Sequence, residues 1–415
     1  MADTPQPGGA GDPDDRPSIP FLGPFDLSQL MGMLQTEGPV NWNVARQVAQ
    51  WVALEGRPDP TVDDADLAQF EELVRAAQTN VAGATALAAT LQSGPRLLGP
   101  GAWANLHLDA LRSVLETLAG SLNEAIQREL AEIDPEEAAS LFEGEAFGDT
   151  PFGGEQLAAM LPALAPTLLG IQAGSMLGYL AQHALGRYDL PLPTSDEPTI
   201  CFVVANIDSF ESEWSLPRDD LRFYLALHEV VHAAERSITW VQRRLIDLAR
   251  EYVSGYEIDS AAFEERFGAI DPSDPEALRA VAQDPAALLG AMQTPGQISV
   301  LERLQCLTGV IEGYADTVLA LIGRPLVPSF DQIHEAIARH RLERGEAGRF
   351  IEGLLGLQLD REHYERGAAF CEGVVDREGL EGLDRLWERE ERLPTPAELE
   401  APGLWLARIE LPDSA

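Results

Sequence analysis

The segment LRFYLALHEVVHAAE, residues 221–235, places His228 and His232 four positions apart, with Glu229 next to the first histidine. Residues four apart in an α-helix differ by about 40° around the axis and by about 6 Å along it, so both imidazoles project from one face. The two rings can bind one metal ion, and Glu229 can reach a water molecule bound to that ion. This is the H-E-x-x-H pattern of zinc hydrolases, with two metal ligands and a general base on one helix.

The same pattern also has a structural interpretation, because three fixed positions out of five arise by chance in many proteins. The flanking sequence favours the metal site. Asp219 and Asp220 suit the first turn of a helix, and neither Pro nor Gly interrupts residues 218–236. A buried helix with two histidines and a glutamate would hold unpaired polar groups unless something such as a metal ion satisfied them.

The composition is that of a globular protein with a very acidic balance of charge. Hydrophobic residues make up 45% of the 415 residues and charged residues 23%, which allows one large or two ordinary domains. There are 68 acidic and 29 basic residues, none of them lysine, and the formal charge is -39. Nucleic acid and anionic membranes are therefore disfavoured as partners, and a basic or neutral peptide or protein substrate fits better.

The cysteines and the N-terminus indicate a cytoplasmic protein. Cys201, Cys306 and Cys371 are far apart and form no C-x-x-C pair, so disulfide scaffolding and a cysteine zinc cluster are both disfavoured. Residues 1–20 have neither a basic region nor an apolar run of the kind found in signal peptides.

Hydrophobic periodicity predicts a mainly α fold with a small β element at about Thr199–Ile207, beside the active-site helix. We expect a disordered tail at 1–24, a helical module at 25–150 and a catalytic domain at 151–415, although the last two can form one continuous unit. Residues 263–295 should alternate short helices with loops, and 393–415, with four prolines, should be loop-like. The predicted helices are 25–35, 40–54, 61–86, 103–130, 156–186, 218–236, 236–252, 298–322, 331–344, 346–357 and 361–377.

The uncharged stretch 156–186 could be a membrane span or a buried helix. Two prolines and several polar side chains leave the clean apolar run too short for a span, so we predict the central buried helix of a bundle. Gly170, Gly174 and Gly178 recur every four residues, a spacing that lets another helix approach closely.

Catalytic zinc keeps three protein ligands, so a third must be found. Glu235 shares the face of the two histidines but lies a further turn along the same straight axis, too far to close a tetrahedral site. Glu312 is the better candidate, because it lies in mid-helix among apolar neighbours, where an unpaired carboxylate is costly. Asp316, four residues on, could then accept the Nδ1 proton of a zinc histidine.

Glu312 also has an ordinary alternative, an ion pair with Arg222 or Arg303. The metal interpretation makes a further prediction about the helix that carries Glu312. Gly309 and Gly313 would let this helix come close to the helix with the two histidines.

Several parts of the sequence carry a family resemblance, namely 185–190, 225–232, 312–316 and 355–357, together with Tyr364, Gly367 and Phe370. They resemble the zincin-like metallopeptidases of actinobacteria, whose members have been labelled hydrolases or proteins associated with coenzyme F420 biosynthesis. The resemblance covers roughly residues 40–405 and implies a mostly helical, gluzincin-like fold with zinc as cofactor and a glutamate as third ligand. One departure is Arg187, where the family more often has glutamine.

The leading hypothesis is therefore peptide-bond hydrolysis at a zinc ion held by His228, His232 and Glu312, with Glu229 as general base. The oxyanion needs a donor, and Tyr364 is preferred over the other candidates. Two alternatives stay open: a catalytically silent zincin-fold binding or scaffold protein, and a zinc hydrolase of a small amide or ester. The other oxyanion candidates are Tyr314, His363 and Arg366.

Overall fold

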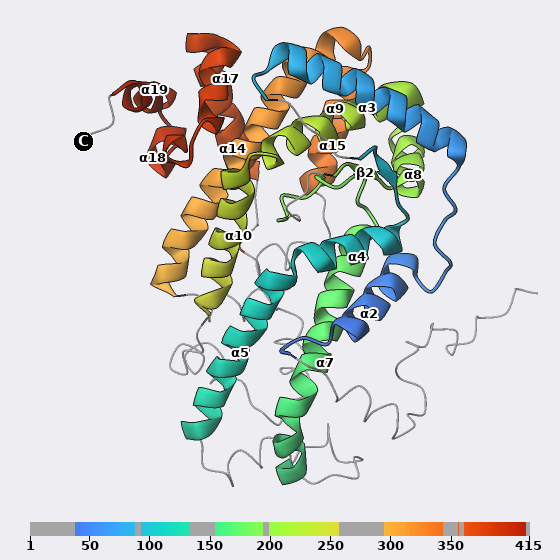
Figure 1. The fold of residues 1–415 in the computed structure, drawn as a ribbon, viewed down its shortest axis with the longest axis vertical. Coiled ribbons are helices and arrows are strands. Elements are labelled where there is room, and N and C mark those ends of the chain that lie inside the picture. The colour runs from blue at the N-terminus through green and yellow to red at the C-terminus, as the bar shows by residue number, and fades with distance from the viewer. Residues whose placement is uncertain are drawn as a thin grey trace, which may run out of the picture.

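The structure is a computed structural model that describes residues 38–87, 93–132, 154–193, 199–256, 294–342, 356 and 361–411. These residues are mostly helical, with one two-stranded sheet, so the predicted fold class is confirmed (Figure 1). The tail 1–24, the helix predicted at 25–35 and most of 263–295 and 346–357 lie outside the described residues. The elements are α2 (Trp42–Leu54), α3 (Asp64–Ala84), β1 (Arg96–Leu97), α4 (Pro100–Ala110), α5 (Arg112–Glu132), α7 (Gly154–Ala181), β2 (Cys201–Phe202), α8 (Val204–Trp214), α9 (Arg218–Arg236), α10 (Thr239–Ser254), α14 (Pro295–Leu326), α15 (Phe330–Leu342), α17 (Arg361–Asp384), the 3₁₀ turns η1 (Arg385–Trp387) and η2 (Glu390–Arg392), α18 (Pro396–Leu399) and α19 (Pro402–Glu410).

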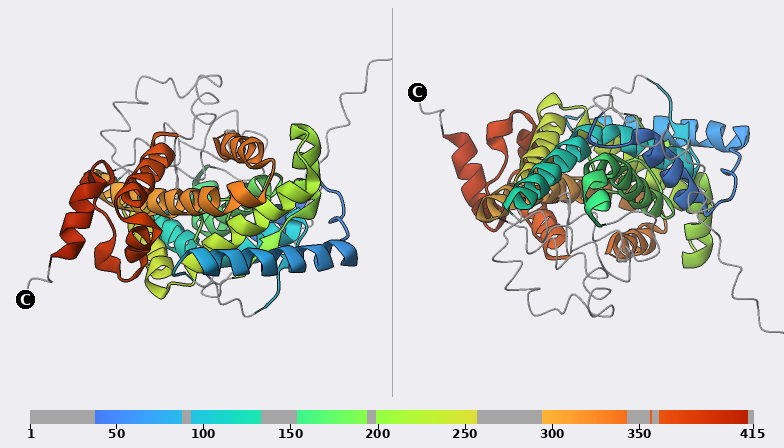
Figure 2. Two further views of the ribbon diagram at one scale, coloured as in Figure 1. Left: turned by 90° about the horizontal axis from the view of Figure 1, so that it is seen from above. Right: turned by 90° about the horizontal axis from the view of Figure 1, so that it is seen from below.

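Helix α9, which carries the two histidines, is buried on almost every side. It begins after Pro217, has Asp219 and Asp220 in its first turn, and ends at Arg236. It contacts α3, α8, α10, α14 and α15, and it lies between α3 and α14 in the view from above (Figure 2). A helix buried in this way must bury its polar residues along with its apolar ones. The predicted helix at 218–236 is confirmed.

The sheet is shorter than the strand predicted at 199–207. β2 pairs with β1 in parallel, with Arg96 opposite Cys201 and Leu97 opposite Phe202. The strand ends there because the chain turns into α8 at Val204. An isolated antiparallel bridge joins Phe202 to Gly186, so the sheet fixes the start of the loop at 186–188.

The three glycines of α7 lie against α2, as their spacing predicts. A Cβ atom at Gly170 would lie 2.5 Å from the carbonyl oxygen of Asn41, and one at Gly174 would lie 2.3 Å from the carbonyl oxygen of Ala45. At Gly178 the Cβ would lie 2.8 Å from the carbonyl oxygen of Ala49. Any side chain at these positions would force the two helices apart.

Helix α7 is nevertheless less buried than predicted, since Leu168 and Tyr179 are 55% and 50% exposed. Within the part of the chain that the structure describes, the helix whose length and apolar composition would suit a membrane span is α14. Since 83% of its apolar window is buried inside the protein, α14 has the character of a core helix.

Two further predictions about elements are wrong in detail. The helix predicted at 103–130 is divided into α4 and α5 at Leu111, and the C-terminal part expected to be loop-like contains α18 and α19. Pro396 and Pro402 are the first residues of these two helices, where the missing N–H costs nothing. Proline therefore starts these helices, whereas we had taken it as evidence for a loop.

The contact between α2 and α7 predicts a large effect of one methyl group. Gly174→Ala should lower the free energy of unfolding by about 2 kcal/mol or more, because its Cβ would overlap the Ala45 carbonyl oxygen. Urea unfolding followed by circular dichroism measures this. The control is Gly120→Ala in α5, where no atom lies within 4 Å of the added Cβ and stability should rise by up to about 1 kcal/mol. Equal stability of the two variants would show that the helices are not in close contact.

Candidate metal centre

His228 and His232 share one face of α9, as their spacing predicts. Their ring centroids are 4.5 Å apart with the ring planes at 68°, and the residues are 4% and 0% exposed. Burial lowers the pKa of His232 well below its usual value, and the neighbouring His228 acts in the same direction. His232 is thus neutral at pH 7, which is the form of histidine that binds a metal ion.

Glu229 is fixed by the backbone of the loop at 186–188. Its Oε1 accepts a hydrogen bond from the N–H of Tyr188 at 2.9 Å, and its Oε2 accepts one from the N–H of Arg187 at 3.0 Å. A Cβ atom at Gly186 would lie 2.4 Å from Oε1, so a larger residue there would displace the Glu229 carboxylate. Each carboxylate oxygen keeps a second lone pair beyond the one that accepts the backbone proton.

Arg187 therefore contributes to this site through its backbone. Its side chain is buried and donates a hydrogen bond to the hydroxyl of Thr199, close to the start of β2. The backbone contact to Glu229 does not depend on which side chain stands at position 187.

Glu235 lies against the second histidine. Its Oε2 is 2.8 Å from Nδ1 of His232, and both residues are fully buried. Neither ring nitrogen of His232 makes a hydrogen bond of good geometry within the described residues. Burial raises the pKa of Glu235 well above its usual value, and the adjacent Arg236 opposes that shift. The Glu235 carboxyl group lies beside Nδ1, so Nε2 is the ring atom open to a ligand.

A buried arginine, Arg341 of α15, connects His228 to two carboxylates. Its Nη2 donates to Nε2 of His228 at 2.9 Å. Its Nη1 donates to both carboxylate oxygens of Asp316, at 3.1 and 3.2 Å, and lies 3.7 Å from Oε2 of Glu312. Guanidinium can only donate, so Nε2 of His228 must be the acceptor and its proton resides on Nδ1.

The charges of this group stabilise one another. Burial raises the pKa of Glu312, and Arg341 opposes that shift. Burial also disfavours the charge on Arg341, but Asp316 and Glu312 outweigh it and raise the pKa of Arg341 well above its usual value. The guanidinium is therefore fully charged, which offsets part of the cost of burying these carboxylates.

The structure places Glu312 in this polar group, where it forms an ion pair with Arg341 at 3.7 Å, so the alternative holds in kind although the two arginines named for it are wrong. Arg222 binds Asp66 at 2.6 Å and Arg303 binds Glu251 at 2.7 Å, so neither pairs with Glu312.

The predicted role of the α14 glycines is also wrong. A Cβ atom at Gly313 would lie 2.4 Å from the backbone of Gly367, and one at Gly367 would lie 2.0 Å from the carbonyl oxygen of Gly309. These glycines therefore bring α14 close to α17, whereas we had predicted a close approach to α9.

Asp316 and the oxyanion candidates have the following places. Asp316 accepts from Arg341, and Glu235 takes the position beside a histidine Nδ1 that we had predicted for Asp316. Tyr314 donates its hydroxyl proton to Asp384 at 2.6 Å, and Arg366 forms ion pairs with Glu362 and Glu400. The ring centroid of Tyr364 lies 5.9 Å from the Arg341 guanidinium carbon, so Tyr364 adjoins the group.

Sequence reasoning missed Arg341, although a signal was present. Phe330, Ile333 and Ile337 form the buried face of α15, and Arg341 follows four residues later on the same face. An arginine at the end of an apolar stripe predicts a buried carboxylate partner.

The donor types in this group suit zinc, because neutral imidazole and carboxylate are its usual nitrogen and oxygen ligands. The buried, unpaired Nε2 of His232 is the atom that such an ion would satisfy. The present side-chain positions do not bring three ligands together: among the described residues, no three His, Cys, Asp or Glu side chains are placed to hold one ion.

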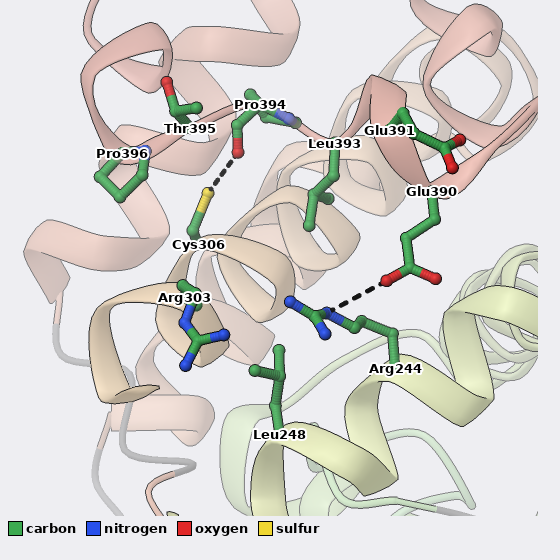
Figure 3. A pocket seen from close by; sticks show the side chains of 10 residues that line it. All are labelled: Arg244, Leu248, Arg303, Cys306, Glu390, Glu391, Leu393, Pro394, Thr395 and Pro396. Atoms are coloured by element: carbon green, nitrogen blue, oxygen red, sulfur yellow. Dashed lines mark hydrogen bonds and ion pairs between the residues drawn. The ribbon is translucent and has the colours of Figure 1, made fainter. Parts of the chain in front are cut away.

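A cavity of about 360 Å³ lies elsewhere, between α10, α14 and the segment 390–396 (Figure 3). Arg244 forms an ion pair with Glu390 at 3.4 Å on one side of it, and Sγ of Cys306 donates to the carbonyl oxygen of Pro394 at 3.0 Å on the other. None of the predicted site residues lines this cavity.

The contact between Gly186 and Glu229 predicts an energetic coupling. Gly186→Ala should lower the free energy of unfolding by about 1–3 kcal/mol, because the new Cβ displaces a carboxylate held by two backbone hydrogen bonds. The cost should shrink when Glu229 is replaced by alanine, which removes the clash. A double-mutant cycle measured by urea unfolding tests this. Additive effects would mean that the two residues do not touch.

A family model described as zincin-like metallopeptidase matches residues 40–406. Among solved structures, a protein from Chloroflexus aurantiacus presumed to be a hydrolase, with a fold described as novel, is similar with a TM-score of 0.58 and 26% sequence identity. That match covers 90% of this chain and 99% of the other. No curated protein matches. Because the family model spans well over half of the sequence, the chain belongs to the zincin-like metallopeptidase family, and this membership supports a metallohydrolase.

Proposed function

We propose that this protein is a zinc-dependent peptidase in which His228, His232 and Glu312 hold the ion. The observation that carries the proposal is the pair of buried imidazoles on one face of α9, 4.5 Å apart, with Nε2 of His232 unpaired. An unpaired polar atom in a protein interior is costly unless it has a functional ligand. Glu312 supports the proposal because it lies in the same buried group and reaches His228 through Arg341.

The chain's own residues have separate roles in this proposal. When bound, zinc would supply Lewis-acid polarisation of the substrate carbonyl and lower the pKa of a water ligand to about 7. Glu229 takes a proton from the attacking water and passes it to the leaving amine. The backbone N–H groups of Arg187 and Tyr188 hold its carboxylate in one orientation and leave a lone pair on each oxygen for that proton.

Two more residues position these groups. Glu235, whose Oε2 lies 2.8 Å from Nδ1 of His232, is proposed to orient that ring when the metal is bound. Tyr364 is proposed as the donor to the developing oxyanion, since its ring adjoins the Arg341 end of the group. The acidic surface of the chain favours a basic or neutral peptide as substrate, with nucleic acid and membranes disfavoured, and a cytoplasmic location is part of the proposal.

A second candidate is a zincin-fold protein that binds a partner and does not catalyse. Two observations favour it. Arg341 uses the Nε2 lone pair of His228, and backbone amides already engage both oxygens of Glu229. In this second candidate, Glu229 holds the loop at 186–188 in place and has no part in catalysis.

Metal analysis combined with a peptide-library digest separates the two candidates. Wild type and Glu229→Gln should both bind stoichiometric zinc, and the variant should lose about 10²- to 10⁴-fold in cleavage rate because it lacks the base. The control Glu335→Gln makes the same change at an exposed carboxylate of α15 and should cleave as wild type does. Zinc binding without cleavage in wild type would favour the binding protein.

A further inference from the structure

We propose that Arg341 is a cationic placeholder for the metal ion. Its guanidinium and a zinc ion compete for the same lone pair of His228, so the ion binds only when Arg341 withdraws. This inference rests on the proposed function, because it takes His228 as a metal ligand. It adds that the zinc affinity of the chain is set by a residue that is not itself a ligand.

The competition follows from the geometry at one atom. Nη2 of Arg341 lies 2.9 Å from Nε2 of His228 and donates a proton to it. An imidazole nitrogen has one lone pair in the ring plane, and zinc would need that lone pair at 2.0–2.1 Å. The two occupants therefore exclude each other at Nε2.

The carboxylates around Arg341 would suit either cation. Asp316 accepts from Nη1 through both oxygens, and Oε2 of Glu312 lies 3.7 Å from the same nitrogen. If Arg341 left with nothing in exchange, Glu312, which is 3% exposed, would remain as an uncompensated buried carboxylate. A divalent ion replaces the lost positive charge, so withdrawal of Arg341 and binding of the metal are linked.

Helix α15 is held at both ends, and next to Arg341 the Nε2 atom of His340 lies 3.1 Å from the carbonyl oxygen of His183. The start of α15 is anchored to α9: Tyr224 contacts His334 through its hydroxyl at 2.9 Å, and the backbone N–H of Ser329 donates to Asp220 at 2.9 Å. Arg341 is the second-last residue of α15, which ends at Leu342. Withdrawal of the arginine side chain by itself is enough to free Nε2 while the backbone of α15 stays in place.

The test is the zinc dissociation constant of the full-length chain, measured by competition with a chromophoric chelator. Arg341→Met removes the competing donor, and Arg341→Lys keeps a charge for Asp316 but lacks the planar fork that reaches Asp316 and His228 together. Both variants should bind zinc about tenfold to a hundredfold more tightly than wild type. The reason is that zinc no longer has to displace the hydrogen bond from the charged guanidinium to His228. The control Arg339→Met removes an exposed arginine from the same helix and should leave the constant unchanged.

Two results would overturn the placeholder: equal or weaker zinc binding by both Arg341 variants, which would make the arginine an organiser of the ligands, or no zinc binding by any variant. If Arg341→Met fails to fold, Arg341→Lys decides. Tighter zinc binding by the Arg341 variants with no peptide cleavage would support the placeholder and contradict the peptidase. Equal affinity with cleavage that depends on Glu229 would support the peptidase and overturn the placeholder.

Discussion

The rest of the structure depends on the burial of two imidazoles and two carboxylates on one helix. His228, Glu229, His232 and Glu235 are each at most 4% exposed on α9, where water cannot satisfy them. Each unpaired polar group at such depth costs about 1–3 kcal/mol, so other elements must supply partners. The loop at 186–188 supplies backbone amides to Glu229, and α15 supplies a guanidinium to His228. The packing of the site is thus arranged around the polar face of α9.

This constraint also explains the placement of charge. The chain has a formal charge of -39, because its acidic residues far outnumber its basic ones. The buried polar group around α9 nevertheless includes an arginine, Arg341 of α15. Acidic surface residues are solvated and need no partner, whereas a buried carboxylate does. Arg341 therefore balances the negative charges of Glu312 and Asp316. Because the same guanidinium donates to His228, a metal ion that displaced it from His228 would also have to replace its positive charge.

The sequence was sufficient for the parts of the site that depend on local periodicity. The four-residue spacing of His228 and His232 placed both rings on one face, and the glycine spacing of α7 predicted a close contact with another helix, which the structure identifies as α2. The partners of these groups depend on tertiary packing, which no local pattern encodes. That is why the contact of Glu229 with the loop at 186–188 and the role of Arg341 were missed. Near the C-terminus we took the prolines as evidence for a loop. Proline interrupts the interior of a helix but fits its first position, which is where Pro396 and Pro402 lie.

The central claim is that the α9 histidines and Glu312 form a zinc site, and zinc K-edge X-ray absorption of the loaded chain tests it most directly. The account predicts imidazole nitrogen and carboxylate oxygen at about 2.0–2.2 Å, with one imidazole fewer in His228→Ala. Sulfur at about 2.3 Å would contradict it by pointing to a cysteine, as would a spectrum that His228→Ala leaves unchanged.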